Sequence, residues 1–185
     1  MSEQKTLMDK ATLTAALDQM AERVMALKPD VTQLALVGIR TRGINVAERL
    51  KTRLDKKAKR DVPIGALDIT LYRDDLSTLA QQPLVGETHL SFDVEGKEIV
   101  LVDDVLYTGR TIRAALDAII DYGRPRRVWL AVLVDRGNRE YPIQPDVAML
   151  KIDTDPNQNV QVRLHEVDGE ENVVVVTKGP HDTQF

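Results

Sequence analysis

The segment from residue 98 to residue 111 reads EIVLVDDVLYTGRT, and the order of residue types in it decides the fold class. The apolar run from Ile99 to Val102 predicts a buried strand. A turn at Thr108 and Gly109 follows, and the helix predicted after it has the inward residues Ile112, Ala115, Leu116, Ile119 and Ile120. A strand, a loop and a helix in this order form an arrangement that binds phosphate groups.

Further strands and helices alternate with this unit along the chain. Continuous apolar runs at residues 34–37 and 128–134 predict two more buried strands. Apolar residues three and four positions apart predict two earlier helices, with inward residues Leu13, Leu17, Met20, Val24 and Leu27 in the first and Ile44, Ala47, Leu50 and Leu54 in the second. The alternation predicts an α/β fold with a mostly parallel central sheet flanked by helices.

Three other stretches are less regular. Leu67, Ile69 and Leu71 alternate with polar residues, which predicts a strand with one wetter face. Residues 73–92 are polar without a sustained period, and a connection of this length is typical of a functional, flexible loop. Short apolar runs after residue 146 have no helices between them, so we expect the edge of the sheet and a small hood over roughly residues 146–180.

Composition narrows the class of protein. A chain of 185 residues, 43% of them hydrophobic, predicts one domain over residues 1–185. The net charge of −4 argues against binding nucleic acid by bulk charge alone. The chain has no cysteine and three scattered histidines, so we expect any metal to be a hard ion held by oxygens. A polar start and the lack of a long apolar run predict a cytoplasmic protein without membrane contact.

The residues after the central strand indicate what it binds. The carboxylates of Asp103 and Asp104 can accept hydrogen bonds from neighbouring ribose hydroxyls. Backbone N–H groups between Thr108 and Thr111, together with the start of a helix, suit a phosphate dianion. The alternative is that the two acids only end a strand and cap a helix. Two adjacent acids followed by a Thr-Gly-x-Thr turn favour a phosphorylated sugar as the ligand.

Four segments, in order, resemble those of the type I phosphoribosyltransferases, and in particular the pyrimidine operon regulatory protein/uracil phosphoribosyltransferase family (PyrR). They are residues 37–43 (VGIRTRG), 68–76 (DITLYRDDL), 102–111 and 131–137 (AVLVDRG). The resemblance implies the type I phosphoribosyltransferase fold. It also implies an enzyme that uses 5-phosphoribosyl-1-diphosphate (PRPP) and Mg²⁺ to convert uracil to UMP and pyrophosphate.

The resemblance also assigns roles to individual residues. It implies catalytic roles for Asp103, Asp104, Arg42 and Arg73, with Mg²⁺ bound mainly through the substrate near the two acids. The residues implied to bind PRPP are Arg40, Thr41, Tyr107, Thr108, Gly109, Arg110 and Thr111. For Arg40 or Arg42 taken alone, the alternative is a solvated turn between a strand and a helix, and for Arg73 it is a solvated charge cluster with Asp74 and Asp75.

Base recognition is implied at Asp135 and Arg136, and at Val147 and Ala148 through their backbone. An ordinary edge strand is the alternative for the segment around Val147. Purine-using relatives often carry Asp immediately before the Thr-Gly of the PRPP loop, where this sequence has Tyr107. The difference favours a pyrimidine.

The family also implies a second role, as a uridine-nucleotide-dependent RNA-binding regulator of pyrimidine genes, and a homodimer or higher homo-oligomer. RNA-binding relatives carry Thr, Arg and His on the outer face of the first helix, where this chain has Asp18, Gln19 and Glu22, and Asn138 replaces a further His. The residues left to donate to RNA are Thr41, Arg126, Arg127 and Arg139. Two alternatives therefore stay open: a regulator whose pocket is a nucleotide sensor, and an enzyme that has lost RNA binding.

Overall fold

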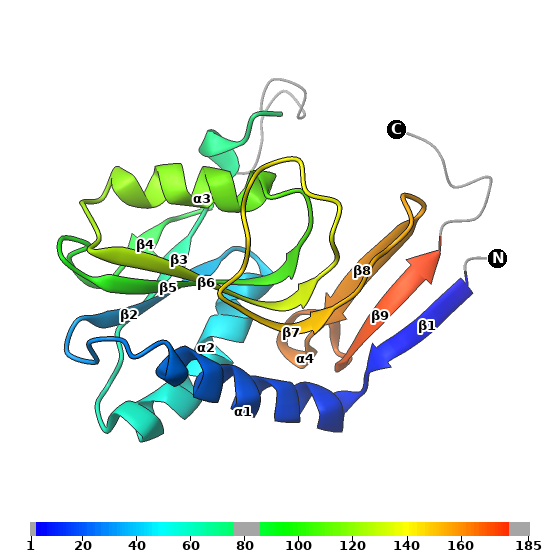
Figure 1. Cartoon of the computed structure of the whole chain (residues 1–185), viewed down its shortest axis with the longest axis horizontal. Helices are drawn as coiled ribbons and strands as arrows, with labels where there is room; N and C mark the ends of the chain where they lie inside the picture. Colours follow the sequence, from blue (N-terminus) through cyan, green and yellow to red (C-terminus); the bar gives the residue numbers. More distant parts are fainter. Residues whose placement is uncertain (1–2, 76–85, 178–185) are drawn as a thin grey trace.

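The computed structural model describes residues 3–75 and 86–177 and contains two β-sheets (Figure 1). The strands are β1 (Glu3–Met8), β2 (Leu34–Ile39), β3 (Ile64–Leu67), β4 (His89–Leu90), β5 (Glu98–Leu106), β6 (Arg127–Asp135), β7 (Val147–Lys151), β8 (Gln158–Arg163) and β9 (Asn172–Thr177). The helices are α1 (Lys10–Ala26), α2 (Arg42–Ala58), α3 (Arg110–Ile120) and α4 (His165–Asp168), with a 3₁₀ turn, η1 (Thr70–Tyr72). No described helix is long and apolar enough to cross a membrane.

The larger sheet has the strand order β4-β3-β2-β5-β6-β7, and every pair in it except β3 with β4 is parallel. Helices α1 and α2 lie on one face and α3 on the other (Figure 1). The α/β fold predicted from the alternation of strands and helices is confirmed. Because the connections between parallel strands cross back over the sheet, the loops that follow β2, β3, β5 and β6 meet at one edge.

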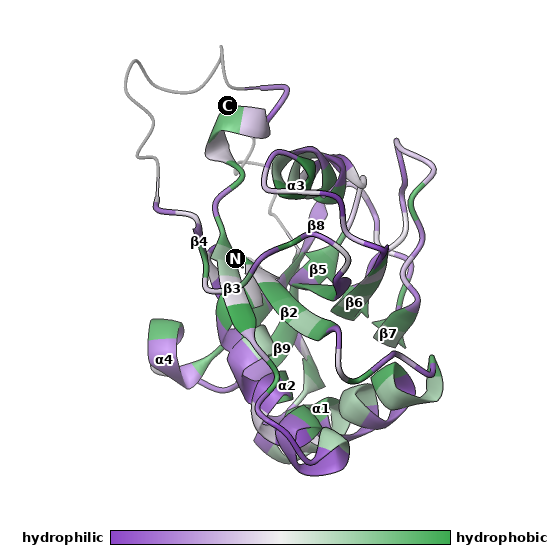
Figure 2. Ribbon diagram, turned by 90° about the vertical axis from the view of Figure 1, so that its left-hand side faces the viewer, coloured by the Kyte–Doolittle hydropathy of each residue, from purple (hydrophilic) through white to green (hydrophobic). Residues whose placement is uncertain are grey.

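The hydrophobic core lies on both faces of the central strand β5. Val100 and Val102 pack with α1 and α2, whereas Ile99 and Leu101 pack with α3. Successive side chains of a strand point to opposite faces, so a strand covered on both sides needs a continuous apolar run. Figure 2 shows these central strands as mostly hydrophobic, flanked by helices in which hydrophobic and hydrophilic residues are mixed. Ile120, expected to face inward, is instead 64% exposed at the last turn of α3.

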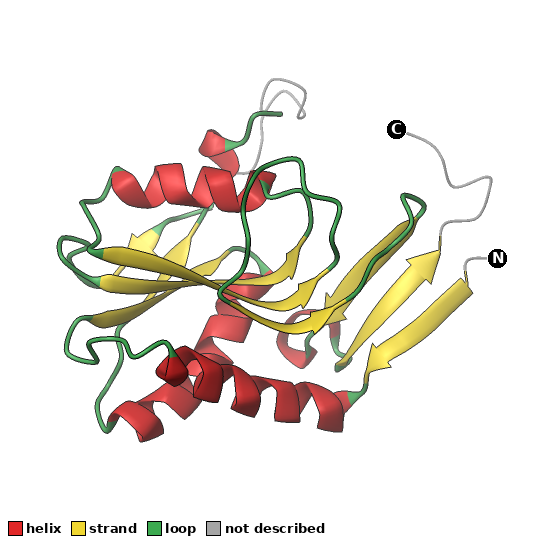
Figure 3. Ribbon diagram, in the orientation of Figure 1, coloured by secondary structure: helices red, strands yellow, loops and turns green. Residues whose placement is uncertain are grey.

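The smaller sheet, the hood, contains β1, β9 and β8 in an antiparallel arrangement (Figure 3). Its strand β1 comes from the start of the chain, a contribution that the polar sequence there did not predict. Strand β7 pairs with β6 and is the edge strand of the larger sheet. The region after residue 146 is therefore divided between the two sheets.

The strand predicted through Leu67, Ile69 and Leu71 is wrong beyond its first residue. One oxygen of Asp68 accepts a hydrogen bond from the Thr70 N–H at 2.7 Å, and this bond turns the chain into η1. Leu71 is consequently 61% exposed. Half of the loop expected at residues 73–92, residues 76–85, lies outside the described residues, and β4 near the end of that loop pairs with β3.

Two glycines allow the first turn of α2 to lie against the strands. A Cβ on Gly38 would come within 2.6 Å of Ile44 Cα, and a Cβ on Gly43 within 2.7 Å of the Val102 carbonyl oxygen. Neither distance is compatible with a real side chain. The absence of a Cβ therefore brings the loop after β2 against the end of β5.

We expect Gly43→Ala to lower the free energy of unfolding by about 2 kcal/mol, the range typical of overpacked interiors. The better helix propensity of alanine contributes roughly 1 kcal/mol in the opposite direction, but the new methyl group would meet backbone that cannot rotate away. Urea unfolding measures the change. Gly96→Ala is the control, because its Cβ would meet no atom within 4 Å and only its φ of +72° is unfavourable. A loss at Gly43 no larger than at Gly96 would contradict the steric argument.

Candidate functional site

Two adjoining cavities lie at the edge where the parallel strands end. The first, which we call the loop cavity, has a volume of about 390 Å³, and its lining includes Arg40, Thr41, Arg42, Asp68, Arg73, Asp103, Asp104 and Thr111. The second, the hood cavity, has a volume of about 350 Å³, and its lining includes Arg42, Asp104, Asn159, Val160, Gln161, Val162, Arg163 and Asp168. Arg42 and Asp104 belong to both linings. The two cavities therefore share a boundary made by one cation and one carboxylate.

The paired acids lie near the carboxyl end of the central strand β5, in different environments. Asp103 is buried, and its carboxylate accepts a hydrogen bond from the Asp104 N–H at 2.9 Å. Burial and the adjacent Asp104 carboxylate raise the pKa of Asp103 well above its ordinary value. Asp104 is half-buried and lines both cavities.

The loop between β5 and α3 has the geometry of an anion site. Gly109 adopts a φ of +92°, which residues with a side chain rarely tolerate, and α3 begins at the next residue. The first N–H groups of a helix point out of its start and attract negative charge. Thr111 of this turn lines the loop cavity. Residues 107–111, which we call the phosphate loop, therefore lie next to the two acids.

Arginines surround this edge, and the described ones are engaged with protein partners. Arg40 Nε donates to the Glu87 carbonyl oxygen at 2.9 Å, and Arg73 pairs with Asp75 at 2.6 and 2.8 Å. Arg42 makes two hydrogen bonds to Asp168 of the hood, at 2.6 and 3.2 Å. The Asp168 partner raises the pKa of Arg42 further.

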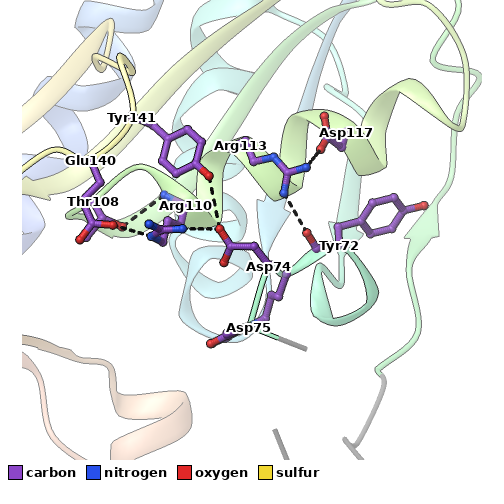
Figure 4. Close-up of polar contacts among 10 residues, drawn as sticks. Tyr72, Asp74, Asp75, Thr108, Arg110, Arg113, Asp117, Glu140 and Tyr141 are labelled. Atoms are coloured by element: carbon purple, nitrogen blue, oxygen red, sulfur yellow. Dashed lines mark hydrogen bonds and ion pairs between the residues drawn. The ribbon is translucent and has the colours of Figure 1, made fainter. Parts of the chain in front are cut away.

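Arg110 of the phosphate loop extends to a separate polar cluster (Figure 4). Its guanidinium pairs with Glu140 and with Asp74, and it lies 5.2 Å from the centre of the Tyr141 ring. Tyr141 also donates to Asp74 at 3.3 Å. The side chain of Arg110 thus fastens the first residues of the loop after η1 to the loop after β6, while its backbone starts α3.

The residues after β6 form a buried layer behind the phosphate loop. The Arg136 side chain lies 4.0 Å over the centre of the Tyr107 ring and donates to Thr154 and to the Gln158 carbonyl oxygen at 3.0 and 2.6 Å. Burial lowers the pKa of Arg136. Asp135 accepts from Arg139 at 2.8 Å. Arg136 therefore connects the phosphate loop to the hood.

Arg139, expected at an RNA surface, is used internally. Besides Asp135, it donates to the carbonyl oxygens of Ile143 and Tyr107 at 2.7 and 2.8 Å, and only 15% of its side chain is exposed. Its contacts hold the loop after β6 against the phosphate loop. Little of the Arg139 side chain is therefore exposed for a contact with RNA.

Val147 and Ala148 are not brought to either cavity. Both are buried in β7, where they pair with Ala131 and Val132, and the Ala148 carbonyl oxygen accepts a hydrogen bond from Arg23 at 3.0 Å. The segment has the geometry of an edge strand, which was the alternative interpretation. Besides Arg42 and Asp104, the hood cavity is instead lined by residues of β8 and by Asp168 of α4. Sequence reasoning missed them, because no motif marks that region.

Comparisons with known proteins agree with this geometry. A family model described as phosphoribosyl transferase domain matches residues 4–167. A protein of Pelotomaculum thermopropionicum named Bifunctional protein PyrR is 51% identical over 94% of this chain and 96% of its own length. One of the same name from Thermus aquaticus is 52% identical over 90% and 92%. A solved hypoxanthine phosphoribosyltransferase of Staphylococcus aureus, 17% identical, covers 94% of this chain and 92% of its own with a TM-score of 0.69, which shows a shared fold.

The fold and the family model together define the class, which is the phosphoribosyltransferases. The chain belongs to the phosphoribosyltransferase family and, within it, to the PyrR branch. The resemblance and the fold expected from the sequence are confirmed.

We expect Asp103→Asn to stabilise the free protein near neutral pH by about 1 kcal/mol. Because the folded state holds the Asp103 proton more tightly than the unfolded chain, stability falls as pH rises from the ordinary Asp pKa through the raised one. An amide does not ionise, so the gain should disappear below about pH 3.5. Urea unfolding of both proteins near neutral pH and in acid measures it. A gain of equal size at both pH values would show that ionisation is not the cause.

Proposed function

We propose that this protein transfers the phosphoribosyl group of PRPP to uracil, forming UMP and pyrophosphate. The observation that carries the proposal is the pair of adjoining cavities with Arg42 and Asp104 at their common boundary. A transferase must hold a donor and an acceptor side by side, with the bond that breaks near the boundary.

The loop cavity suits PRPP. Asp103 and Asp104 can accept hydrogen bonds from the ribose hydroxyls, and the N–H groups at the start of α3 can hold the 5′-phosphate. Arg40, Arg42 and Arg73 line the remaining wall, where the pyrophosphate group would lie. Their present partners are a backbone carbonyl and single carboxylates, which a more highly charged pyrophosphate can replace.

The hood cavity suits the base. Strand β8 is the edge strand of the hood sheet, so alternate residues direct their N–H and C=O groups away from β9. Because the Gln158 carbonyl oxygen accepts from Arg136, the outward set contains Val160 and Val162. Backbone donors and acceptors along this edge can pair with the alternating acceptors and donor of uracil. We assign base recognition to β8 in place of Val147 and Ala148.

In the transfer, a bond forms between uracil N1 and ribose C1 while the bond from C1 to the pyrophosphate oxygen breaks. The N1 proton passes to solvent, and the electron pair of the broken bond leaves with pyrophosphate. The protein orients both reactants and places Arg42 where negative charge accumulates. No described cluster of three His, Cys, Asp or Glu residues could hold a metal by itself. Mg²⁺, bound chiefly through PRPP oxygens near Asp103 and Asp104, would neutralise part of the pyrophosphate charge.

We expect Asp103→Asn with Asp104→Asn to lower UMP formation by at least about 100-fold, because amides cannot match charged acceptors for the ribose hydroxyls. Product analysis with PRPP, Mg²⁺ and each free base in turn should detect UMP with uracil and no nucleotide with hypoxanthine. The control is Asp93→Asn with Asp117→Asn, which removes two carboxylates outside both cavities. Activity of the site variant within tenfold of the unaltered protein, or a preference for hypoxanthine, would contradict the proposal.

A second function, uridine-nucleotide-dependent RNA binding, is favoured by the relatives named Bifunctional protein PyrR. The acidic residues on α1 do not form an uncompensated negative strip. Asp18 pairs with Arg53 at 2.6 Å, and Glu22 with Lys57 at 3.6 Å, both from α2. The acids instead occupy two cations that could otherwise reach phosphates. We propose that operon leader RNA binds weakly or through shifted contacts, and more tightly with UMP.

We expect Asp18→Thr with Glu22→His to strengthen leader RNA binding at least about tenfold, since the change frees Arg53 and Lys57 and removes two negative charges. Titration at fixed salt, with and without UMP, measures the affinity. Asp117→Thr, in α3 on the opposite face of the sheet, is the control for a general charge effect. Nanomolar, UMP-dependent binding by the unaltered protein would refute weak binding.

A further inference from the structure

The contact between Arg42 and Asp168 joins two parts of the chain far apart in sequence. Arg42 is the first residue of α2, next to the loop cavity, and Asp168 is the last residue of α4, next to the hood strands. Both hydrogen bonds are made by different nitrogens of one guanidinium to different oxygens of one carboxylate, at 3.2 and 2.6 Å. A paired contact of this kind fixes the plane of the guanidinium as well as its distance.

Asp168 is itself held in place. The oxygen that accepts from Arg42 Nε also accepts from the Leu164 N–H at 2.9 Å, and 18% of the Asp168 side chain is exposed. Gly169, with a φ of +68°, turns the chain directly after it. The hydrogen bonds from Arg42 lower the pKa of Asp168, so the carboxylate stays charged at neutral pH.

A second arginine fastens the same part of the hood without touching the cavities. Arg49, two turns further along α2, pairs with Glu166 at 2.7 Å and with Glu171 at 2.5 Å. Neither cavity is lined by Arg49, Glu166 or Glu171. Two arginines of α2 therefore attach the segment around α4. Only the contact between Arg42 and Asp168 also fixes a side chain, that of Arg42, at the boundary of the two cavities.

We propose that Asp168 is a positioning residue for Arg42, which it holds at the boundary between the loop cavity and the hood cavity. In the proposed reaction the guanidinium would lie near the oxygen that leaves C1, so its orientation would matter most when charge develops on the departing pyrophosphate. The inference rests on the proposed transfer reaction, but pyrophosphate binding tests it without a base.

Neutralising Asp168 can make pyrophosphate binding either tighter or weaker. The direction of the change distinguishes a positioning role of Asp168 from a purely electrostatic effect. By Coulomb's law alone, neutralising Asp168 beside an anion site should strengthen pyrophosphate binding. If Asp168 acts by orienting Arg42, its neutralisation should weaken binding, since the side chain of Arg42 must then be ordered by the ligand. The variant Asp168→Asn keeps an oxygen for the Leu164 N–H and removes the second carboxylate oxygen from Arg42.

The experiment combines Asp168→Asn, Arg42→Ala, the double variant and Glu171→Gln in the full chain. Calorimetry with pyrophosphate and Mg²⁺ should show binding at least fivefold weaker for Asp168→Asn. When Arg42 is already replaced by alanine, Asp168→Asn should alter pyrophosphate binding less than twofold, because a residue that acts through Arg42 has nothing left to position. Glu171→Gln, which removes a similarly sequestered carboxylate from the other arginine, should change binding less than twofold.

Steady-state kinetics with uracil and PRPP give the second measurement. Asp168→Asn should lower kcat at least tenfold with less than threefold change in the KM for PRPP, since an interaction strongest in the transition state affects kcat. If the unaltered protein makes no UMP, the proposed function fails, while the calorimetry still decides the role of Asp168. Tighter pyrophosphate binding by Asp168→Asn, an equal loss in both Arg42 backgrounds, or an equal loss in Glu171→Gln would overturn the positioning role.

Discussion

The carboxyl group of Asp103 is almost entirely buried near the end of the central strand, where it meets the loop cavity, and the surrounding chain is shaped by that constraint. A buried carboxylate is costly unless hydrogen bonds or charges compensate it. The Asp104 N–H is one donor, and on the side of α2 Asp103 packs against Gly43, whose missing Cβ would lie 3.2 Å from a carboxylate oxygen. The position of Asp103 therefore depends on a glycine in α2 and on the neighbouring acid. Stability is given up here for a site that can accept the hydroxyl groups of a sugar.

The first turn of α2 connects the buried Asp103 with the contacts that attach the hood. Gly43 brings the turn onto the end of β5, and Arg42, the residue before it, consequently lies where the two cavities meet. Arg42 can then reach Asp168, and Arg49 reaches Glu166 and Glu171 from the same helix. One close backbone approach thus determines how the hood is attached. A Cβ at position 43 would meet the Val102 carbonyl oxygen and Asp103, so the backbone near the acids would have to shift.

The sequence predicts the larger sheet well for a physical reason. Strands covered on both faces must be apolar throughout, and β2, β5 and β6 consequently stand out from the rest of the chain. The residues of the phosphate loop are contiguous, so their spacing alone places Asp103, Asp104 and Gly109 together. The strand predicted as far as Leu71 is wrong, because an alternating pattern cannot reveal that the Asp68 side chain turns the chain before Leu71.

The hood and its contacts could not be predicted in the same way. The polar strand β1 is stabilised by pairing with β9, from the other end of the described chain, and local sequence does not contain that pairing. Asp168 likewise has no neighbours in sequence that identify Arg42 as its partner, 126 positions away. Val147 and Ala148 line neither cavity, and the sequence could not show this because an apolar edge strand has the same pattern whether it belongs to the larger sheet or to the hood.

The similarity to solved hypoxanthine phosphoribosyltransferases separates what the fold determines from what individual residues determine. At 17–19% identity, the superposition still has TM-scores of 0.69 to 0.71, so the arrangement of strands and helices tolerates the replacement of most side chains. The shared fold determines where a phosphorylated sugar can be held, but it does not determine which base is used. In this chain Tyr107 stacks on the buried Arg136, and Arg136 in turn donates to Asn159 and to the backbone of β8. The phosphate loop and the proposed base site are therefore mechanically connected by a single side chain.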